Sequence, residues 1–562
     1  MRNIPSDKAY DVAIIGSGFA GTTLASILAR QGLQVVVFEA KEHPKFSIGE
    51  SMILETSETM RTLAEFYDVP ELAYFSSENF ADYIGTSHGV KRHFSYLHHT
   101  MNQDQHDRQR TLQAVIPKEP HGHELHLFRQ DSDALMLATA IRYGATVHQN
   151  TPITEIAIDP DGITIHTHKN EHVQANYVVD ASGFRSPIAQ KLDLRVYDQQ
   201  TQSRAIFTHM IDVANFHDIS ASREAYAIPF SLDEGTLHHV FDGGWLWIIP
   251  FNNHSRSTNH TISVGLLLDP RKYPVRDDLT PEAEFFSFID QYPAMAAQFK
   301  DAKAIRGWVR TQRIQYGSKQ IVGDRWALLG HAAGFIDPLY SKGLYNSLTA
   351  VSMLSHLLLK AQKTGDFSAD AFAPLATVTQ NYLSMNDRLV ANSYRAFKHP
   401  DLWQVYSVVW LLGAYTELVK LMSMRSHHQD DHDAYYQELC GLQLAGGGFA
   451  GYFRIAHAID EMMQTLDLDN ENDVQHVVRQ ASTLLRDLDW IPDPFIAVLD
   501  GAVTLPRTKL RLSLLHPKNG FLRTGDYRRH FFGDANMLDV IQEFITEKMH
   551  YSQTALRKRR TQ

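Results

Sequence analysis

The sequence predicts an α/β fold in which a Rossmann-type βαβ unit comes first, an antiparallel sheet follows, and a helical region closes the chain. Three observations predict it. The glycine-rich turn GSGFAG separates two apolar segments, at residues 10–15 and 35–39. Residues 205–267 are rich in β-branched and aromatic side chains with Gly and Asn breaks, which is typical of strands. After Gly343, amphipathic patterns such as LTAVSMLSHLLLKAQ indicate long helices.

The elements follow from these patterns in chain order. A strand at 10–15, a helix at 22–31 and a strand at 35–39 form the first βαβ unit. The segment ITEIAIDPDGITIHTH contains an Asp-Gly turn between alternating residues, so a hairpin is expected there. The next segment, NYVVDASG, reads as a buried strand that ends in a glycine turn.

Chain length predicts more than one structural unit. A chain of 562 residues is expected to divide into two or three subdomains. We expect a core at residues 1–385, in which a substrate-sheet subdomain at about 85–125 and 190–310 interrupts the first subdomain. A helical C-terminal region is expected at 386–562, where DVQHVVRQASTLLRDLDW is strongly amphipathic.

Composition excludes several classes of protein. The formal charge of −11 argues against a nucleic-acid partner. A single cysteine, Cys440, forms neither an internal disulfide nor a CxxC site, which favours a reducing cytoplasm. The first residues, MRNIPSDKA, lack the apolar core of a secretion signal.

Three further segments invite a functional interpretation. The apolar stretch from Leu402 is interrupted by Gln404, Glu417 and Lys420, so it predicts a buried helix rather than a membrane span. The patch SHHQDDHD lacks the ligand spacing of a metal site, and a solvated linker explains it better than adventitious metal binding. The basic run 557–560 reads as a solvated tail.

The glycine-rich turn predicts a dinucleotide site. Gly16, Gly18 and Gly21 follow a strand and open a helix, so the backbone can approach a pyrophosphate at the positive helix end. Glu39 ends the second strand, where its carboxylate can accept hydrogen bonds from ribose hydroxyls. A glycine turn without a ligand is the alternative.

Two indoles form a rigid surface in the middle of the chain. Trp245 and Trp247 in WLWIIP lie two residues apart, so on a strand they point to the same face. Such a wall beside a flavin would keep organic substrates away from it. The alternative is that both are core residues of a sheet.

These motifs together resemble those of the flavin-dependent halogenases. WLWIIP resembles their WxWxIP signature, VVDASG and ALLGHAAGFIDP resemble flavin-contacting segments, and FIDPLYSKG fits F-x-x-P-x-x-S-x-G. The resemblance covers roughly the first 350 residues and implies an FAD-binding fold of the hydroxylase and halogenase type. In this pattern relatives commonly carry GDAA where this chain has His331, and imidazole can still donate or accept a hydrogen bond.

The resemblance implies a set of cofactor and halide residues. Arg129 resembles an arginine that approaches the flavin, although an ion pair with Asp131 or Asp133 is equally compatible. The halide is expected on the backbone amides of Ser341, Lys342 and Gly343, where a turn forms an anion-binding nest, unless Pro and Gly merely shape the turn there. The expected FAD contacts are Gly16, Ser17, Gly18, Phe19, Ala20, Gly21, Glu39, Ser51, Arg129, Gly330, His331, Gly343 and Leu344.

A lysine some forty residues beyond a Gly-Glu dipeptide is essential in the family, and GES at Gly49 places Lys91 in that role. An ammonium can hydrogen-bond hypohalous acid, and a neutral amine can form a haloamine. Glu50 is expected to orient Lys91 or the substrate. An exposed, idle lysine is the alternative.

The resemblance implies a halogenase that uses FADH2, O2 and chloride or bromide. Tyr340 replaces a glutamate of tryptophan halogenases, which favours a phenolic or tyrosine-derived substrate over free tryptophan. Some similar halogenases act on substrates tethered to carrier proteins. The resemblance implies a separate flavin reductase as partner, and the lack of a second dinucleotide fingerprint in the sequence agrees with this without proving it. The alternatives are an FAD-dependent aromatic monooxygenase and a flavin-binding scaffold without catalysis.

Overall fold

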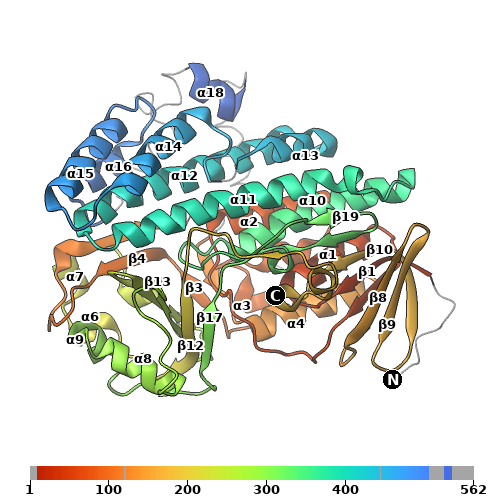
Figure 1. Ribbon diagram of the computed structural model, residues 1–562, viewed down its shortest axis with the longest axis horizontal. Helices are drawn as coiled ribbons and strands as arrows, with labels where there is room; N and C mark the ends of the chain where they lie inside the picture. The colour runs from red at the N-terminus through yellow and green to blue at the C-terminus, as the bar shows by residue number, and fades with distance from the viewer. Residues whose placement is uncertain (1–8, 119–121, 444, 505–524, 534–562) are drawn as a thin grey trace, which may run out of the picture.

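The computed structural model describes residues 9–118, 122–443, 445–504 and 525–533, and Figure 1 shows their arrangement. Two sheets lie below a layer of long helices. The expectations for residues 1–8 and 557–560 lie outside the described residues.

The first sheet contains the βαβ unit. Its strands follow the order β19-β20-β10-β1-β2-β7, and β1 is parallel to both β2 and β10. The expected hairpin is present as β8 and β9, and β9 continues the sheet antiparallel to β10. The strands are β1 Ala9–Ile15, β2 Val35–Phe38, β7 Thr146–His148, β8 Ile153–Asp159, β9 Gly162–Thr167, β10 His172–Asp180, β19 Val322–Gly323 and β20 Trp326–Leu328.

Four helices pack together beside this sheet. Helix α1 contacts α4 and α10, and α10 also contacts α2. Helix α1 begins at Phe19 rather than at residue 22, because the turn closes immediately after Gly18. The helices are α1 Phe19–Arg30, α2 Leu54–Tyr67, α4 Arg129–Arg142 and α10 Gly343–Thr364.

The second sheet matches the expected substrate sheet. Its order is β16-β12-β15-β14-β13-β4-β5, with β17 also paired to β12. All its pairs are antiparallel except β13 with β4, which are parallel because a long connection separates these two strands. The strands are β4 His93–His98, β5 Thr111–Val115, β12 Arg204–Ile211, β13 Thr236–Phe241, β14 Gly244–Pro250, β15 Ile262–Leu268, β16 Lys303–Ala304 and β17 Val309–Arg313.

The two faces of this sheet enter two different apolar cores. Along β14, Trp245 and Trp247 belong to the large core shared with the first sheet and the helical layer. Leu246 and Ile248 point to the other face and join a smaller core. That smaller core is closed by α6 Phe216–Ile219, α7 Arg223–Tyr226, α8 Pro281–Ile289 and α9 Pro293–Ala296, at the lower left of Figure 1.

Short elements connect the two sheets. Strand β3, Gly89–Lys91, pairs antiparallel with β6, Glu124–His126. A second small pair joins β11, Arg195–Val196, to β18, Gly317–Ser318. The short helices are α3 Phe80–Tyr83 and α5 Pro187–Lys191.

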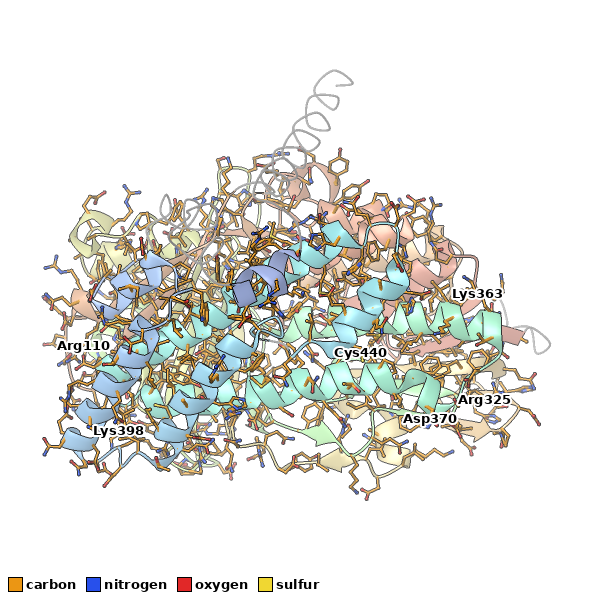
Figure 2. All side chains as sticks on the ribbon, turned by 90° about the horizontal axis from the view of Figure 1, so that it is seen from above. Arg110, Arg325, Lys363, Asp370, Lys398 and Cys440 are labelled. Carbon is orange, nitrogen blue, oxygen red and sulfur yellow. The ribbon has the colours of Figure 1, made fainter. Side chains whose placement is uncertain are left out.

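The helical layer begins before the expected boundary. Helix α11 runs without a break through residue 385, so a division there would cut a helix. Figure 2 looks down on this layer, which includes Cys440. Its helices are α11 Ala369–Ala396, α12 Pro400–His427, α13 His432–Gly441, α14 Ala450–Thr465, α15 Glu471–Arg486, α16 Asp493–Leu499 and α18 Gly525–Phe532.

Helix α12 is the apolar segment that the sequence predicts to be buried. Among the described residues it is the one helix long and apolar enough to cross a membrane, and 78% of its apolar window lies inside the protein. The SHHQDDHD patch spans its last residues and the start of α13. There Asp431 accepts from the backbone N–H of Ala434, and His428 bonds to Glu438 at 2.8 Å.

We expect Gly21→Ala to lower the thermal stability of the protein. A β-carbon at this position would lie 2.2 Å from the carbonyl oxygen of Gly16, so α1 would have to move away from the turn. We put the cost at about 2 kcal/mol or more. Gly18→Ala is the matched control, because nothing lies within 4 Å of its β-carbon position. Equal unfolding temperatures for the two variants, measured by circular dichroism, would contradict this packing.

Candidate functional site

The glycine-rich turn leaves the start of α1 uncovered. Gly16 has a φ of +100°, and a β-carbon there would lie 2.7 Å from the carbonyl oxygen of Ala181. At Gly18 the space is open, and α1 begins with neither a capping side chain nor an acidic residue in its first turn. Free N–H groups at a positive helix end attract anions. This end of α1 therefore fits a pyrophosphate.

Glu39 is held beside this turn as an acceptor. Its Oε2 accepts from the backbone N–H and the hydroxyl of Ser17 at 3.0 and 2.9 Å, and its Oε1 accepts from the N–H of Lys41 at 2.9 Å. Lys45 forms an ion pair with it. Burial raises the pKa of Glu39, but Lys45 and these hydrogen bonds outweigh burial and lower it below its ordinary value. The carboxylate is therefore ionised, as ribose binding requires.

Arg129 begins α4 and is buried. Its guanidinium pairs with both oxygens of Asp133 at 2.8 and 2.9 Å, so that ion pair exists, inside the protein rather than on its surface and without Asp131. Nη1 also donates to the carbonyl oxygens of Ile48 and Gly49 at 2.6 and 3.1 Å. Arg129 thereby holds the backbone of Ile48 and Gly49, the two residues that precede Glu50.

His331 is neutral and faces the start of α10. Burial, together with the charge of Arg129, lowers the pKa of His331 to about 4. Its Nε2 is buried and has no hydrogen-bond partner in the described part of the chain. A β-carbon at Gly343 would lie 3.2 Å from that nitrogen, and the Phe335 ring packs edge-on at 4.8 Å. This unpartnered nitrogen is available to a hydroxyl of a bound flavin chain, and Gly330, with a φ of +56°, forms the turn before it.

The segment 337–343 turns sharply into α10. Ser341 has a φ of +56°, a left-handed conformation that is rare outside glycine. Helix α10 begins at Gly343 after Lys342, with no capping side chain and no acidic residue in its first turn. The N–H groups of Gly343 and Leu344 therefore lie at the positive end of a 22-residue helix, which suits a halide.

The side chain of Lys342 anchors this segment to helices α12 and α2. Its Nζ lies 2.8 Å from Glu417 Oε2 on α12 and 3.6 Å from Glu55 Oε1 on α2. Tyr345 donates to the other oxygen of Glu417 at 3.0 Å. Burial lowers the pKa of Lys342, but the two carboxylates raise it by more, so the ammonium is retained. Two carboxylates thus occupy this side chain, so its ammonium is not free to bind an anion.

The Lys91 amine lies at the same segment, with 0% of the residue exposed. Its Nζ donates to Ser51 Oγ and to the Met52 carbonyl oxygen at 2.8 Å each, and it lies 3.4 Å from Ser341 Oγ. The amine also lies 3.4 Å from the centre of the Phe94 ring. Burial lowers the pKa of Lys91 well below its ordinary value.

Glu50 is bonded elsewhere. Its Oε1 lies 2.7 Å from His209 Nε2, so this oxygen is engaged away from Lys91. The adjacent Ser51 contacts the amine, because neighbouring residues of an extended segment point to opposite sides. An orienting role of Glu50 towards the substrate and a cofactor contact of Ser51 stay predictions.

Glu124 is a buried carboxyl group that the sequence did not single out. It lies opposite Lys91 in the β3–β6 pair, and the Ser57 hydroxyl donates to it. Burial raises the pKa of Glu124 to about 7. The alternation of Glu124 and His126 in HELHLF, with the period of a strand, was the signal available.

The two tryptophans lie side by side as predicted. Their ring centres are 5.9 Å apart, and both are buried on one face of β14. Trp245 Nε1 donates to the Tyr394 hydroxyl at 3.0 Å, which donates to Asp337 at 3.0 Å. Burial raises the pKa of Asp337 to about 6. Trp247 Nε1 donates to Ser263 Oγ at 3.1 Å.

Tyr340 faces the helical layer. Its ring stacks on Trp410 of α12 at 4.7 Å, and its hydroxyl lies 2.5 Å from Ser393 Oγ of α11. Two helices of the C-terminal region, α11 and α12, therefore contact the segment at which the halide is expected.

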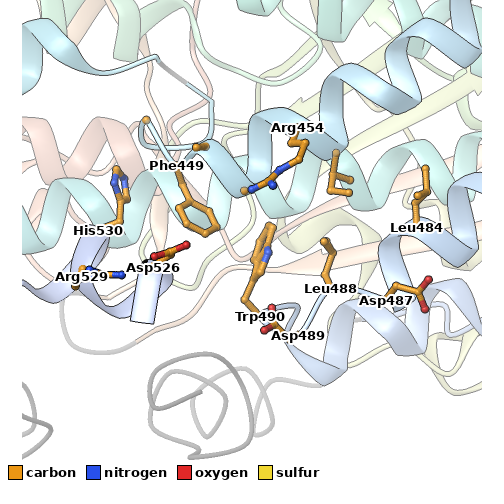
Figure 3. Close-up of a pocket in the computed structure, with 14 residues that line it drawn as sticks. Phe449, Arg454, Leu484, Asp487, Leu488, Asp489, Trp490, Asp526, Arg529 and His530 are labelled. Atoms are coloured by element: carbon orange, nitrogen blue, oxygen red, sulfur yellow. Dashed lines mark hydrogen bonds and ion pairs between the residues drawn. The ribbon is translucent and has the colours of Figure 1, made fainter. Parts of the chain in front are cut away.

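A cavity of about 790 Å³ lies elsewhere, among the C-terminal helices (Figure 3). Phe449 and Trp490 pack edge to face in its lining, with ring centres 5.2 Å apart, and Arg454 lies above them. None of the predicted site residues lines it, so volume alone does not identify the site here.

Comparison with known proteins is consistent with this geometry. Residues 9–272 match a family model described as an FAD binding domain. The chain is 38% identical over 498 residues to tetracycline 7-halogenase of Kitasatospora aureofaciens, covering 86% of this chain and 88% of that protein. It is 41% identical over 445 residues to the monodechloroaminopyrrolnitrin halogenase PrnC of Pseudomonas fluorescens, covering 77% and 78%.

Among solved structures, the crystal structure of halogenase PltM in complex with phloroglucinol and FAD is similar. It superposes with a TM-score of 0.83 at 32% identity, covering 88% of this chain and 99% of that one. The similarity thus extends through the helical layer.

We expect Lys342→Met to destabilise the protein strongly. The substitution leaves Glu417 and Glu55 buried without a countercharge, and breaking a buried pair in this way costs about 3–5 kcal/mol. The free energy of unfolding in urea measures the loss.

Lys363→Met is the control for Lys342→Met. Lys363 is an exposed lysine near the end of the same helix, labelled at the edge of Figure 2, and its loss should change stability by about 0.5 kcal/mol or less. Similar unfolding midpoints for the two variants would show that Lys342 contributes no more than a surface lysine does.

Proposed function

The chain belongs to the flavin-dependent halogenases, and from that premise we propose that it halogenates a phenolic or tyrosine-derived ring through hypohalous acid and Lys91. It is an oxidoreductase that binds FAD and uses a halide. The observation that carries the proposal is the 3.4 Å separation between the Lys91 amine and Ser341 Oγ. At this distance the lysine lies next to the segment 337–343, where the start of α10 suits a halide.

The residues that would hold FAD fit the group. The uncovered start of α1 takes the pyrophosphate, and ionised Glu39 accepts from the ribose. The free Nε2 of His331 offers an acceptor or donor near Gly343, in place of the acidic residue common in relatives. When bound and reduced, FAD supplies the oxidising power by activating O2.

The halide lies at the start of α10 in this proposal. The N–H groups of Gly343 and Leu344 point to an anion there, and no acidic side chain in the first turn opposes it. Lys342 holds the start of this helix in place through its buried ammonium, which pairs with Glu417 and lies near Glu55.

Trp245 and Trp247 separate the organic substrate from the flavin. Two buried indoles with bonded N–H groups cannot swing aside without breaking those bonds, so the barrier is rigid. Hypohalous acid is small enough to move through an interior that excludes an aromatic ring.

Lys91 then presents the halogen to the acceptor ring. Its ammonium donates a hydrogen bond to the oxygen of the hypohalous acid, so the oxygen leaves as water while the halogen replaces a ring hydrogen. The ring proton leaves with that water, which balances the reaction. Because burial lowers the pKa of Lys91, a neutral amine that forms a haloamine is the other route.

A phenolic acceptor agrees with the residues around the segment. Tyr340 is neutral and engaged with Ser393, and so supplies no carboxylate to activate an indole. A phenol activates its own ring when its hydroxyl loses a proton. PltM is described in complex with phloroglucinol, a phenol, which supports this class.

Flavin-dependent halogenases generally receive reduced flavin from a reductase. We propose the same partner here and place the enzyme in the cytoplasm, since its one cysteine suits a reducing compartment. Burial raises the pKa of the Cys440 thiol, which disfavours a redox role for it.

Halide titration tests the proposed reaction. With a phenol, O2 and FADH2 from a reductase, halogenated product should rise with bromide or chloride and saturate. A carrier-bound phenol is the second acceptor to test. Hydroxylated product that is independent of halide would establish the aromatic monooxygenase instead, and absence of O2 consumption above the free-flavin rate would indicate a non-catalytic scaffold.

Lys91→Met tests the lysine. The substitution keeps the length of the side chain and removes the amine, so FADH2 oxidation should continue while halogenated product falls by roughly 100-fold or more. Lys300→Ala, at an exposed lysine, is the control and should behave as the unmodified enzyme. Halogenation retained in Lys91→Met would move the catalytic role to another residue.

A further inference from the structure

We infer that Thr236 and His126 are positioning residues for Lys91, and that they fix the direction of its N–H bonds through a chain of hydrogen bonds that ends on the tryptophan strand. This inference rests on the proposed role of Lys91. The chain runs from Lys91 Nζ to Ser51 Oγ at 2.8 Å, to Thr236 Oγ1 at 3.0 Å and to His126 Nε2 at 2.9 Å. It continues from His126 Nδ1 to the Pro250 carbonyl oxygen at 2.8 Å.

The last bond sets the direction of all the others. The carbonyl oxygen of Pro250 can only accept, so His126 carries its proton on Nδ1. His126 is 0% exposed, and burial, reinforced by the Lys91 charge, lowers its pKa to about 3, so the ring is neutral and Nε2 must accept. Thr236 therefore donates to His126.

The hydroxyl groups transmit this direction to the amine. Thr236 has one proton and uses it on His126, so the Ser51 hydroxyl donates to Thr236. Ser51 then has only lone pairs to offer Lys91, and the amine must donate to it. Each hydroxyl is both donor and acceptor, and no alternative order of the protons satisfies the chain.

The consequence is an amine with one weakly bonded N–H. An ammonium has three donors, of which one is committed to Ser51 and a second to the Met52 carbonyl oxygen. The third faces Ser341 Oγ at 3.4 Å, too long for a strong bond. This leaves a single donor directed at the segment from which hypohalous acid arrives.

The chain also favours the donor form of the amine. If the Thr236 hydroxyl were removed, the Ser51 proton could turn to the Lys91 nitrogen, which accepts it only as a neutral amine. An intact chain therefore holds the Lys91 pKa higher than a broken one would. The other titratable groups that act on Lys91, or are acted on by it, are Glu55 on α2, Glu124 on β6, His93 on β4 and His238 on β13.

Thr236→Val tests the chain, because valine keeps the shape and lacks the hydroxyl. The halogenation rate is expected to change with pH where Lys91 titrates, and we call this part of the pH profile the Lys91 limb. In Thr236→Val this limb should move to lower pH by about one unit. The direction is the same whether the ammonium or the neutral amine reacts, since both limbs follow the same pKa. Thr236→Ser keeps the hydroxyl and should restore the profile.

Two further variants separate this effect from a loss of structure. Thr208→Val removes another buried hydroxyl from the same sheet, one that donates to the Arg306 carbonyl oxygen at 2.9 Å, and should leave the limb in place. His126→Asn removes the acceptor of Thr236 while keeping a side-chain donor, and should shift the limb as Thr236→Val does. A limb that stays in place in Thr236→Val, or moves equally in Thr208→Val, would overturn the inference.

Nitrogen NMR of 15N-histidine protein reads the chain without any halogenation. The His126 signals, identified by their loss in His126→Asn, should show a protonated Nδ1 and a hydrogen-bonded, unprotonated Nε2. In Thr236→Val the Nε2 signal should move towards that of an unbonded ring nitrogen. A protonated Nε2, or a signal unmoved in Thr236→Val, overturns the chain even if the enzyme halogenates. Absence of halogenated product from the unmodified enzyme would refute the proposed function alone.

Discussion

The segment 337–343 must satisfy the polar groups of three buried side chains, Asp337, Tyr340 and Lys342, while it brings the half-buried Ser341 to Lys91, and the arrangement of the site depends on that requirement. An unpaired polar group costs more free energy inside a protein than in water, so each side chain has to find a partner. Asp337 accepts from Tyr394, Tyr340 bonds to Ser393, and Lys342 pairs with Glu417. Ser341 approaches Lys91. Because the partners come from three elements, Ser393 and Tyr394 from α11, Glu417 from α12 and Lys91 from β3, the segment has one conformation that suits them all.

That conformation includes backbone strain at Ser341. A positive φ at a non-glycine residue is unfavourable and persists only where the surroundings determine it. Here the neighbours on both sides are fixed, Tyr340 by stacking on Trp410 and Lys342 by two carboxylates. The serine hydroxyl of this strained residue lies 3.4 Å from the Lys91 amine, and helix α10 begins two residues later.

Much of this site follows from local sequence, and the remainder depends on tertiary contacts. The GSGFAG turn, the DG hairpin and the paired tryptophans have short-range causes, so spacing alone predicts them. Lys91 was placed by its distance from the Gly-Glu dipeptide, and its burial agrees. The contact to Lys91 comes from Ser51 rather than from Glu50, because which of the two meets the amine depends on the side of the segment that faces β3. Glu124, Thr236 and Tyr394 come from distant segments, and no local pattern shows that they converge.

Helix α11 passes from the region that carries the first sheet into the C-terminal layer without interruption, and it contributes Tyr394 and Ser393 on the way. The C-terminal helices therefore contact the segment 337–343 directly and are not an appended module. Exchange of these helices between related enzymes would change the contacts that hold this segment. Divergence in this family should consequently show paired changes in the two regions, with substitutions in α11 and α12 accompanying those around residue 340.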